Sequence, residues 1–188
     1  MFKGSFMQVL SRFTWELPQT LLGHEIAQYS NMIYMVQDVN YYDGATVVTA
    51  TKLSLFHGAF TLGSYIIGSS DLEAIPSNYL FQHEYGHYLQ SQAFGPFYLS
   101  KIALPSLYND IFHNSSHKNN AIERDANLRA FIYFNSTIDD FKISNWHNSV
   151  NPINGYSIHL SYEEIMKRNN TILDWGYIFN PFKYHLRK

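Results

Sequence analysis

Residues 78–96 have the sequence NYLFQHEYGHYLQSQAFGP, and this stretch decides the expected fold. Pro76-Ser77 just before it predicts a helix start with Ser77 as the N-cap, because a serine hydroxyl can accept a hydrogen bond from a free amide of the first turn. Gly95-Pro96 predicts the helix end, since proline cannot continue a helix. We therefore expect a helix of about four turns over residues 78–92.

This helix carries the motif H-E-x-x-H at His83-Glu84-Tyr85-Gly86-His87. Residues four apart lie on one helical face, so both imidazoles can bind a single metal ion. Glu84 is expected to point toward the open side of that ion, where it can act as general base on metal-activated water. The motif predicts a zinc site with His83 and His87 as ligands and Glu84 as a catalytic residue.

The chain contains an internal comparison for this motif. His24-Glu25 begins in the same way, but Gln28 stands where the second histidine would be. With nine histidines in 188 residues, a chance match to the whole motif has an expectation of roughly 1–2%. Because the match at His83 also falls on an independently expected helix, we expect a genuine metal site there.

A third metal ligand is expected elsewhere, because a catalytic zinc ion usually has three protein ligands and one open position. The chain has no cysteine, which leaves histidine, aspartate or glutamate. Glu123 is the best candidate, on a second expected helix over residues 121–134 that Asn119 or Asn120 would open. The alternative third ligands are Asp125, His113 and His117.

Three residues predict how the two helices meet. Gly86 costs about 1 kcal/mol of helix propensity relative to alanine, which a close helix crossing would explain. Ala126 is small enough to allow that crossing. Asn127 shares a helical face with Glu123, so we expect its side chain to hydrogen-bond a ligand histidine and fix its tautomer.

The rest of the chain predicts an α+β fold. Apolar residues at helical spacing predict a helix over residues 13–30, with a break near Pro18. Asp43-Gly44 predicts a tight turn between two strands, at residues 32–40 and 45–51. Residues 59–68 are the third expected strand.

Composition excludes several classes of protein and site. The chain is 46% apolar and 15% charged, which is typical of a folded globular domain. Without cysteine there is no disulfide, thiolate metal site or cysteine nucleophile. A net charge of −2 without a long basic run predicts no nucleic-acid partner. We also expect a soluble chain with no membrane span and no signal peptide, since Arg12 and Glu16 interrupt the N-terminal apolar residues.

The two motifs together resemble the gluzincin group of zinc metallopeptidases. His83 to His87 corresponds to H-E-x-G-H, and residues 123–127 correspond to E-x-x-A-N. In the CAAX-protease-like branch the second motif ends in aspartate, where this chain has Asn127. The resemblance implies that zinc is bound by two histidines on one helix and by Glu123 on the next.

A longer part of the chain is similar to a narrower group, the metallopeptidase domains of bacterial proteins that include RHS-repeat and other polymorphic toxins. The similar stretches are residues 80–91, 95–96, 104–107 and 58–63. This implies one zincin-like metallopeptidase domain over residues 1–188, with a catalytic core at 13–135 and a C-terminal extension at 136–188. It also implies a toxin or effector domain of a larger secreted protein, with a cognate immunity protein as partner.

The zincin resemblance implies a small antiparallel sheet packed on the active-site helix and on the second ligand-bearing helix. In zincins an edge strand beside the active helix pairs with an extended substrate, and residues 59–68 are the candidate for that strand. An ordinary core strand is the alternative for these residues.

Peptide hydrolysis also needs a group that stabilises developing negative charge or donates a proton. The candidates are Tyr133, Tyr156, His147 and His159. We select His159, in the alternating stretch at residues 156–160, as the second catalytic residue, although a lone histidine of this kind is more often structural.

These observations predict a zinc-dependent metallopeptidase that acts on a peptide or protein through metal-activated water. One alternative is a non-catalytic zinc-binding domain that binds a partner protein. The presence of Glu84 argues against it, because a purely structural zinc site needs no base. The other is a metal-independent domain in which both histidines merely pack.

Overall fold

A computed structural model describes residues 6–51, 58–112, 120–153, 161 and 163–164 of the chain, and its α+β class confirms the expectation. The helices are α1 (Phe6–Arg12), α2 (Leu17–Met32), α3 (Tyr79–Phe94), α4 (Leu104–Phe112) and α5 (Ala121–Thr137). The strands are β1 (Val36–Tyr42), β2 (Ala45–Ala50), β3 (Ala59–Leu62) and β4 (Tyr65–Gly68). Short helical turns lie at η1 (Gly95–Phe97), η2 (Leu99–Ala103) and η4 (Ile143–Asn145).

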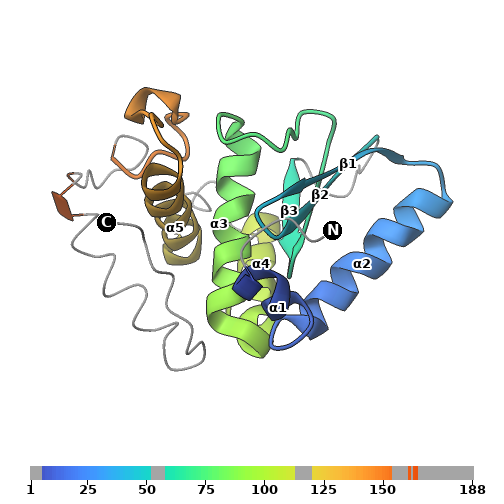
Figure 1. The fold of residues 1–188 in the computed structure, drawn as a ribbon. Helices are drawn as coiled ribbons and strands as arrows, with labels where there is room; N and C mark the ends of the chain where they lie inside the picture. The colour runs from blue at the N-terminus through green and yellow to red at the C-terminus, as the bar shows by residue number, and fades with distance from the viewer. Residues whose placement is uncertain (1–5, 52–57, 113–119, 154–160, 162, 165–188) are drawn as a thin grey trace.

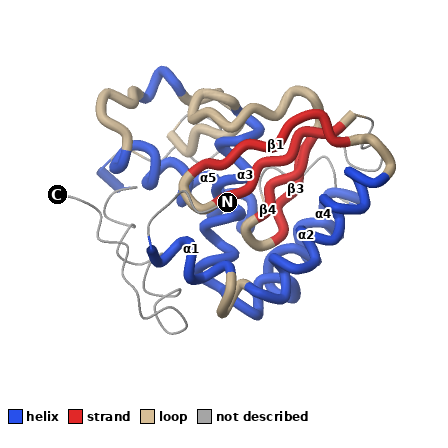
Figure 2. Tube along the Cα trace, turned by 45° about the vertical axis from the view of Figure 1, so that its right-hand side comes forward, coloured by secondary structure: helices blue, strands red, loops and turns tan. Residues whose placement is uncertain are grey.

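The elements are arranged in layers, with the sheet between α2 on one side and α3 on the other (Figures 1 and 2). Helix α5 packs on the side of α3 that faces away from the sheet (Figure 1). Each central strand therefore has two buried faces. On β2 and β4, Val47 and Ile66 belong to the large core that includes α3 and α5, whereas Val48 and Ile67 pack in the smaller core that includes residues of α2.

The sheet is mixed, so the expected antiparallel sheet is wrong. Its strand order is β1-β2-β4-β3; β2 and β4 run parallel, and the other neighbours run antiparallel. The strand that follows β2 in the sequence, β3, lies at the far edge of the sheet. The next strand, β4, lies between β2 and β3. Residues 59–68 are consequently two strands, β3 and β4, joined at Gly63-Ser64. Of these two strands, β3 lies at an edge of the sheet and β4 lies inside it.

The helical N-terminal region also differs from expectation. The helix expected at residues 13–30, with a break near Pro18, begins only at Leu17 as α2; residues 13–16 form a turn that separates it from an earlier helix, α1. Pro18 lies in the first turn of α2, where a missing N–H costs nothing. Helix α2 then runs on to Met32, and Tyr34 has a left-handed backbone (φ 57°), so β1 begins at Val36 instead of residue 32.

Helix α3 begins one residue later than expected. Asn78 is its N-cap in place of Ser77, because the Asn78 side-chain oxygen accepts a hydrogen bond from the Phe81 amide at 3.0 Å. Gly95 ends the helix as expected, with a left-handed φ of 52°. The cap of α5 is Asn120, which was one of the two expected residues.

Helices α3 and α5 cross in close contact at Gly86 and Ala126. A methyl group at Gly86 would overlap the backbone carbonyl of Ala126, so only glycine fits there. Ala126 itself is fully buried. The close crossing expected from these two small residues is confirmed, and it fixes the distance between the two helices.

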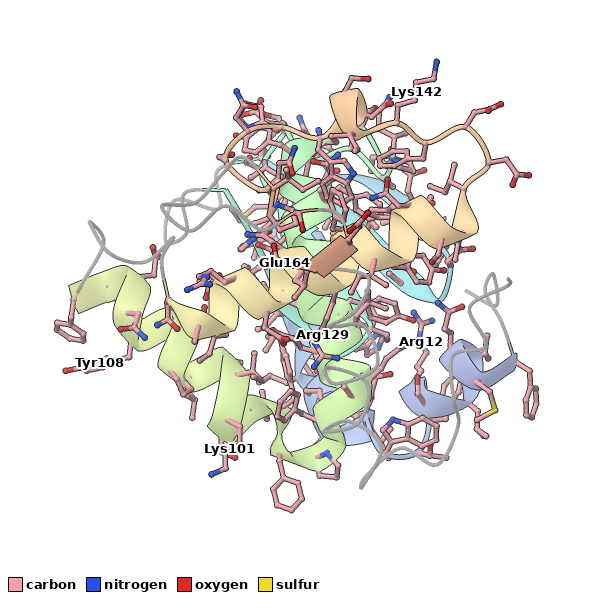
Figure 3. The ribbon with its side chains drawn as sticks, turned by 90° about the vertical axis from the view of Figure 1, so that its left-hand side faces the viewer. Arg12, Lys101, Tyr108, Arg129, Lys142 and Glu164 are labelled. Carbon is pink, nitrogen blue, oxygen red and sulfur yellow. The ribbon has the colours of Figure 1, made fainter. Side chains whose placement is uncertain are left out.

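Helix α4 follows η1 and η2 and projects from this body (Figure 3). None of its residues is buried, and Tyr108 points away from the other elements (Figure 3). Its large exposed side chains are Leu104, Tyr108, Ile111 and Phe112. Across the described ranges, every helix falls short of the length and apolar character needed to cross a membrane.

Gly86→Ala should destabilise the fold by about 3 kcal/mol or more, because the added methyl group meets backbone, which cannot rotate away. Urea unfolding followed by circular dichroism measures this change. Gln28→Ala, an exposed position on α2, is the control and should change stability by less than about 0.5 kcal/mol. Equal stability of Gly86→Ala and the wild type would contradict the close crossing.

Candidate metal centre

Helix α3 presents His83 and His87 on one face, as the four-residue spacing requires. Their ring centroids are 4.8 Å apart, and the ring planes are nearly perpendicular at 89°. The His83 side chain is 23% exposed and that of His87 is 8% exposed. Solvent therefore reaches the pair from the His83 side.

Helix α5 brings Glu123 to these two histidines. Glu123 lies in the first turn of α5, one turn before the crossing at Ala126, and its side chain is only 1% exposed. One carboxylate oxygen, Oε2, lies 3.1 Å from His83 Nε2 and 3.1 Å from His87 Nε2. Across the described residues, His83, His87 and Glu123 form a cluster whose ligand atoms all lie within 4.8 Å of one another.

The other nitrogen of each imidazole faces an amide oxygen. His83 Nδ1 lies 2.9 Å from Asn127 Oδ1, and His87 Nδ1 lies 2.8 Å from Gln90 Oε1. An amide oxygen can only accept a hydrogen bond, so each Nδ1 donates. In the neutral imidazoles this leaves both Nε2 atoms with a free lone pair directed at the cluster.

Further contacts fix the orientation of the Gln90 amide. Gln90 Nε2 donates to the Ile122 carbonyl at 2.9 Å and to Asp125 Oδ2 at 2.7 Å. Arg129 Nε donates to the same Asp125 oxygen at 2.7 Å. Because both Gln90 partners are acceptors, its amide nitrogen must face them and its oxygen must face His87.

Glu123 is held through its second carboxylate oxygen. Ser106 Oγ, on α4, donates to Glu123 Oε1 at 2.6 Å. This leaves Oε2 directed at the two histidines. The serine also links the exposed helix α4 to the cluster.

The charges in the cluster shift the pKa of each member. Burial alone would lower the His83 pKa, but the hydrogen bond to Glu123 and the charges of Glu84 and Glu123 raise it to about 9. Burial opposes charge on His87 as well, and its pKa is nevertheless raised by the charge and hydrogen bond of Glu123. For Glu123, burial favours the neutral acid, but the two histidines hold its pKa well below the usual range.

These three donors fit a divalent transition-metal ion. Two imidazole lone pairs and a carboxylate oxygen directed at one point repel each other unless a positive charge lies between them. Donors bound to zinc at about 2.0–2.1 Å in tetrahedral geometry lie about 3.3 Å apart, close to the separation of 3.1 Å found for each histidine and Glu123. His83, His87 and Glu123 can therefore form a metal site.

Glu84 lies beside this cluster on α3 and is 5% exposed. Thr61 Oγ1, on the edge strand β3, lies 2.7 Å from Glu84 Oε2 and 3.0 Å from the Glu84 carbonyl oxygen. The charge of Glu84 contributes to the raised pKa of both His83 and His87, so its carboxylate is within electrostatic reach of both. Glu84 is therefore a buried carboxylate next to His83 on α3, held by a residue of the edge strand.

Among the described residues, the structure separates Glu123 from Asp125, one of the alternative third ligands. Asp125 is engaged by Gln90 and Arg129 and is not part of the cluster. His113 and His117 lie outside the described residues. Asn127 makes the expected contact with a ligand histidine, His83.

Two candidates for a proton donor, Tyr133 and His147, are described, and both have partners elsewhere than at the cluster. Tyr133 donates to Asp43 Oδ2 at 3.1 Å, at the turn between β1 and β2. His147 contacts Ser149 and is exposed. The chosen residue, His159, and Tyr156 both lie outside the described residues, so their roles stay predictions.

Three residues at the site were missed by sequence reasoning. Gln90 is three residues after His87, so helical spacing alone could have suggested their contact. Ser106 and Thr61 come from α4 and β3, and their contacts arise only when the chain folds. Both lie in stretches that carry the family resemblance, residues 58–63 and 104–107, but a serine or threonine in such a stretch does not reveal which side chain it contacts.

Gln90→Leu should weaken zinc binding by about 10–100-fold, because His87 loses the group that fixes its tautomer and orientation. Competition with a chromophoric chelator measures the change in affinity. Gln82→Leu is the matched control, since Gln82 is buried on the same helix but donates to the Pro76 and Asn145 carbonyls. Equal zinc affinities for the two variants would contradict the proposed role of Gln90.

Metal affinity should rise with pH up to about 9, the pKa of His83. Below that pH the metal must displace protons from His83 and His87, so affinity should increase about tenfold or more per pH unit between about pH 6 and 8. Calorimetry in two buffers of different ionisation enthalpy counts the protons released. At pH 7, release of no proton on zinc binding would contradict the raised pKa values of the two histidines.

Comparison with known proteins adds no further constraint. No protein-family model, curated protein or solved structure matches this chain. Function therefore has to be inferred from the residues and contacts of the cluster itself.

Proposed function

We propose that this chain is a zinc-dependent metallopeptidase. The observation that carries the proposal is the convergence of His83, His87 and Glu123 on one point, with Glu84 next to His83 on α3 and its carboxylate held by Thr61. A site that only stabilises the fold would need the ligands alone. The additional buried carboxylate supports a catalytic site.

Zinc is the ion that this donor set favours. Two imidazoles and one carboxylate without any thiolate are a common set for catalytic zinc, and they leave a fourth position for water or substrate. The partial exposure of His83 supports access from solvent. The amide partners of both histidines supply the outer contacts that such ligands usually have.

In the proposed reaction, His83, His87 and Glu123 hold the zinc ion, and Glu84 moves the proton. A bound zinc ion supplies Lewis acidity, which polarises a substrate carbonyl and lowers the pKa of a water molecule. Glu84 accepts a proton from the attacking water and later donates it to the nitrogen of the departing amine. The water oxygen ends in the new carboxylate, and the peptide C–N bond is broken.

We further propose that an extended substrate lies along β3. This strand is the sheet edge nearest α3, which supports pairing by main-chain hydrogen bonds. The Thr61 carbonyl already accepts a hydrogen bond from the Tyr98 hydroxyl at 3.0 Å. A substrate that pairs at Thr61 would therefore need Tyr98 to release this carbonyl.

The wider biological role rests on the sequence resemblance alone. A toxin or effector domain delivered by a larger protein would be expected to have a small neutralising partner in the producing cell. Co-purification of such a protein with this chain would support that role over a housekeeping protease.

Glu84→Gln should keep about one zinc ion per chain and lower hydrolysis by about 100-fold or more, because the amide cannot accept the proton. Metal analysis and digestion of a peptide library with mass-spectrometric readout measure the two properties. Glu25→Gln is the matched control, since Glu25 follows a histidine on α2 in the incomplete copy of the motif. This control should leave both properties unchanged.

The same experiment separates the alternatives. A wild-type chain without zinc would overturn the metal site. A chain that binds zinc and cleaves no peptide would instead be a non-catalytic zinc-binding domain. Full activity of Glu84→Gln would remove Glu84 from the reaction.

A further inference from the structure

We propose that Thr61 is a positioning residue for Glu84. The Thr61 hydroxyl holds one oxygen of the Glu84 carboxylate, so that the other oxygen is left to carry the proton. The inference rests on the proposed peptidase function. It assigns a role to the edge strand β3 that does not depend on substrate pairing.

The contact between these two residues is short and buried. Thr61 is 5% exposed, and its hydroxyl lies 2.7 Å from Glu84 Oε2 and 3.0 Å from the Glu84 carbonyl. A hydroxyl has one hydrogen to donate, and the charged carboxylate is both the nearer and the stronger acceptor. The Thr61 hydroxyl therefore donates mainly to Oε2.

Thr61 is itself fixed on two sides. Its backbone pairs in register with Ile66 of β4, and its carbonyl accepts a hydrogen bond from the Tyr98 hydroxyl at 3.0 Å. Tyr98 is 2% exposed and lies between η1 and η2, the short helical turns that follow α3. The hydroxyl that holds Glu84 thus belongs to a residue with little freedom to move.

The two oxygens of Glu84 consequently have different surroundings. Among the residues that the structure describes, the Glu84 carboxylate accepts a hydrogen bond through Oε2, from Thr61. A glutamate side chain without such a contact samples several rotamers. A carboxylate that is not held in this way would also be attracted by a cationic centre between His83, His87 and Glu123. Fixing Oε2 keeps the Glu84 carboxylate at a defined distance from the cationic centre and leaves Oε1 for proton transfer.

Thr61→Val tests this role, because valine has the shape of threonine without its hydroxyl. We expect kcat on a peptide identified by library digestion to fall about 10–100-fold, with KM and zinc content little changed. Thr61→Ser restores the hydroxyl and should recover most of kcat. In Thr61→Val/Glu84→Gln the loss should not exceed that of Glu84→Gln alone, since both changes act on one group.

Thr49→Val is the matched control. Thr49 lies on β2 of the same sheet, and its hydroxyl donates to the Leu72 carbonyl at 3.0 Å. Its kcat should stay within about twofold of the wild type. Thermal unfolding shows whether the variants fold, and Thr61→Ala replaces Thr61→Val if valine prevents folding.

Crystal structures of the zinc-loaded wild type and Thr61→Val give a readout that does not depend on activity. We expect the Glu84 carboxylate to leave its wild-type position in the variant. An unchanged carboxylate, or an unchanged kcat in an active enzyme, overturns the role of Thr61. A wild type that binds zinc and hydrolyses nothing overturns the peptidase proposal instead, and the crystal comparison still decides whether Thr61 positions Glu84.

Discussion

The close crossing of α3 and α5 is the constraint on which the candidate site depends. Gly86 has no side chain, so the Ala126 carbonyl can lie against the α3 backbone. That contact places Glu123 Oε2 within 3.1 Å of His83 Nε2 and His87 Nε2, and it brings Asn127 to His83. A methyl group at position 86 would move α3 and α5 apart. Glu123 would then have to span a wider gap to reach His83 and His87. Glycine at position 86 lowers the helix propensity of α3, but it allows the close contact that assembles the cluster.

Contacts from four elements hold the polar groups of the cluster in place. Ser106 of α4 holds Glu123, Thr61 of β3 holds Glu84, and Gln90 and Asn127 hold the histidines from α3 and α5. Most of these groups are nearly inaccessible to solvent, where unpaired polar atoms are costly. The cluster therefore needs a positive charge at its centre, which imidazole protons or a metal ion can supply.

The local features of this architecture were predictable from sequence, whereas the long-range ones were not. Spacing and capping residues predicted α3, α5 and the Asp43-Gly44 turn, because each depends on neighbours in the chain. The close approach of α3 and α5 was predictable for another reason, since Gly86 is unfavourable within a helix unless another chain segment needs the space. The parallel pairing of β2 with β4 was missed, since nothing in residues 59–68 shows that the chain crosses to the far edge before turning back. Likewise, spacing indicated the ligands, but Thr61 and Ser106 become recognisable only through tertiary contacts.

His83 and His87 are both supported by neutral amides, and this has a consequence in acid. A carboxylate in the place of Asn127 or Gln90 would bind an imidazole N–H more strongly but would be neutralised when it takes up a proton. Amides do not titrate in this range, so the grip of these two side chains on the imidazole rings should be the same at pH 5 as at pH 8. The lowest pH at which the chain retains a metal ion would then be set by protonation of the imidazoles and Glu123, and not by loss of the contacts that orient the imidazoles.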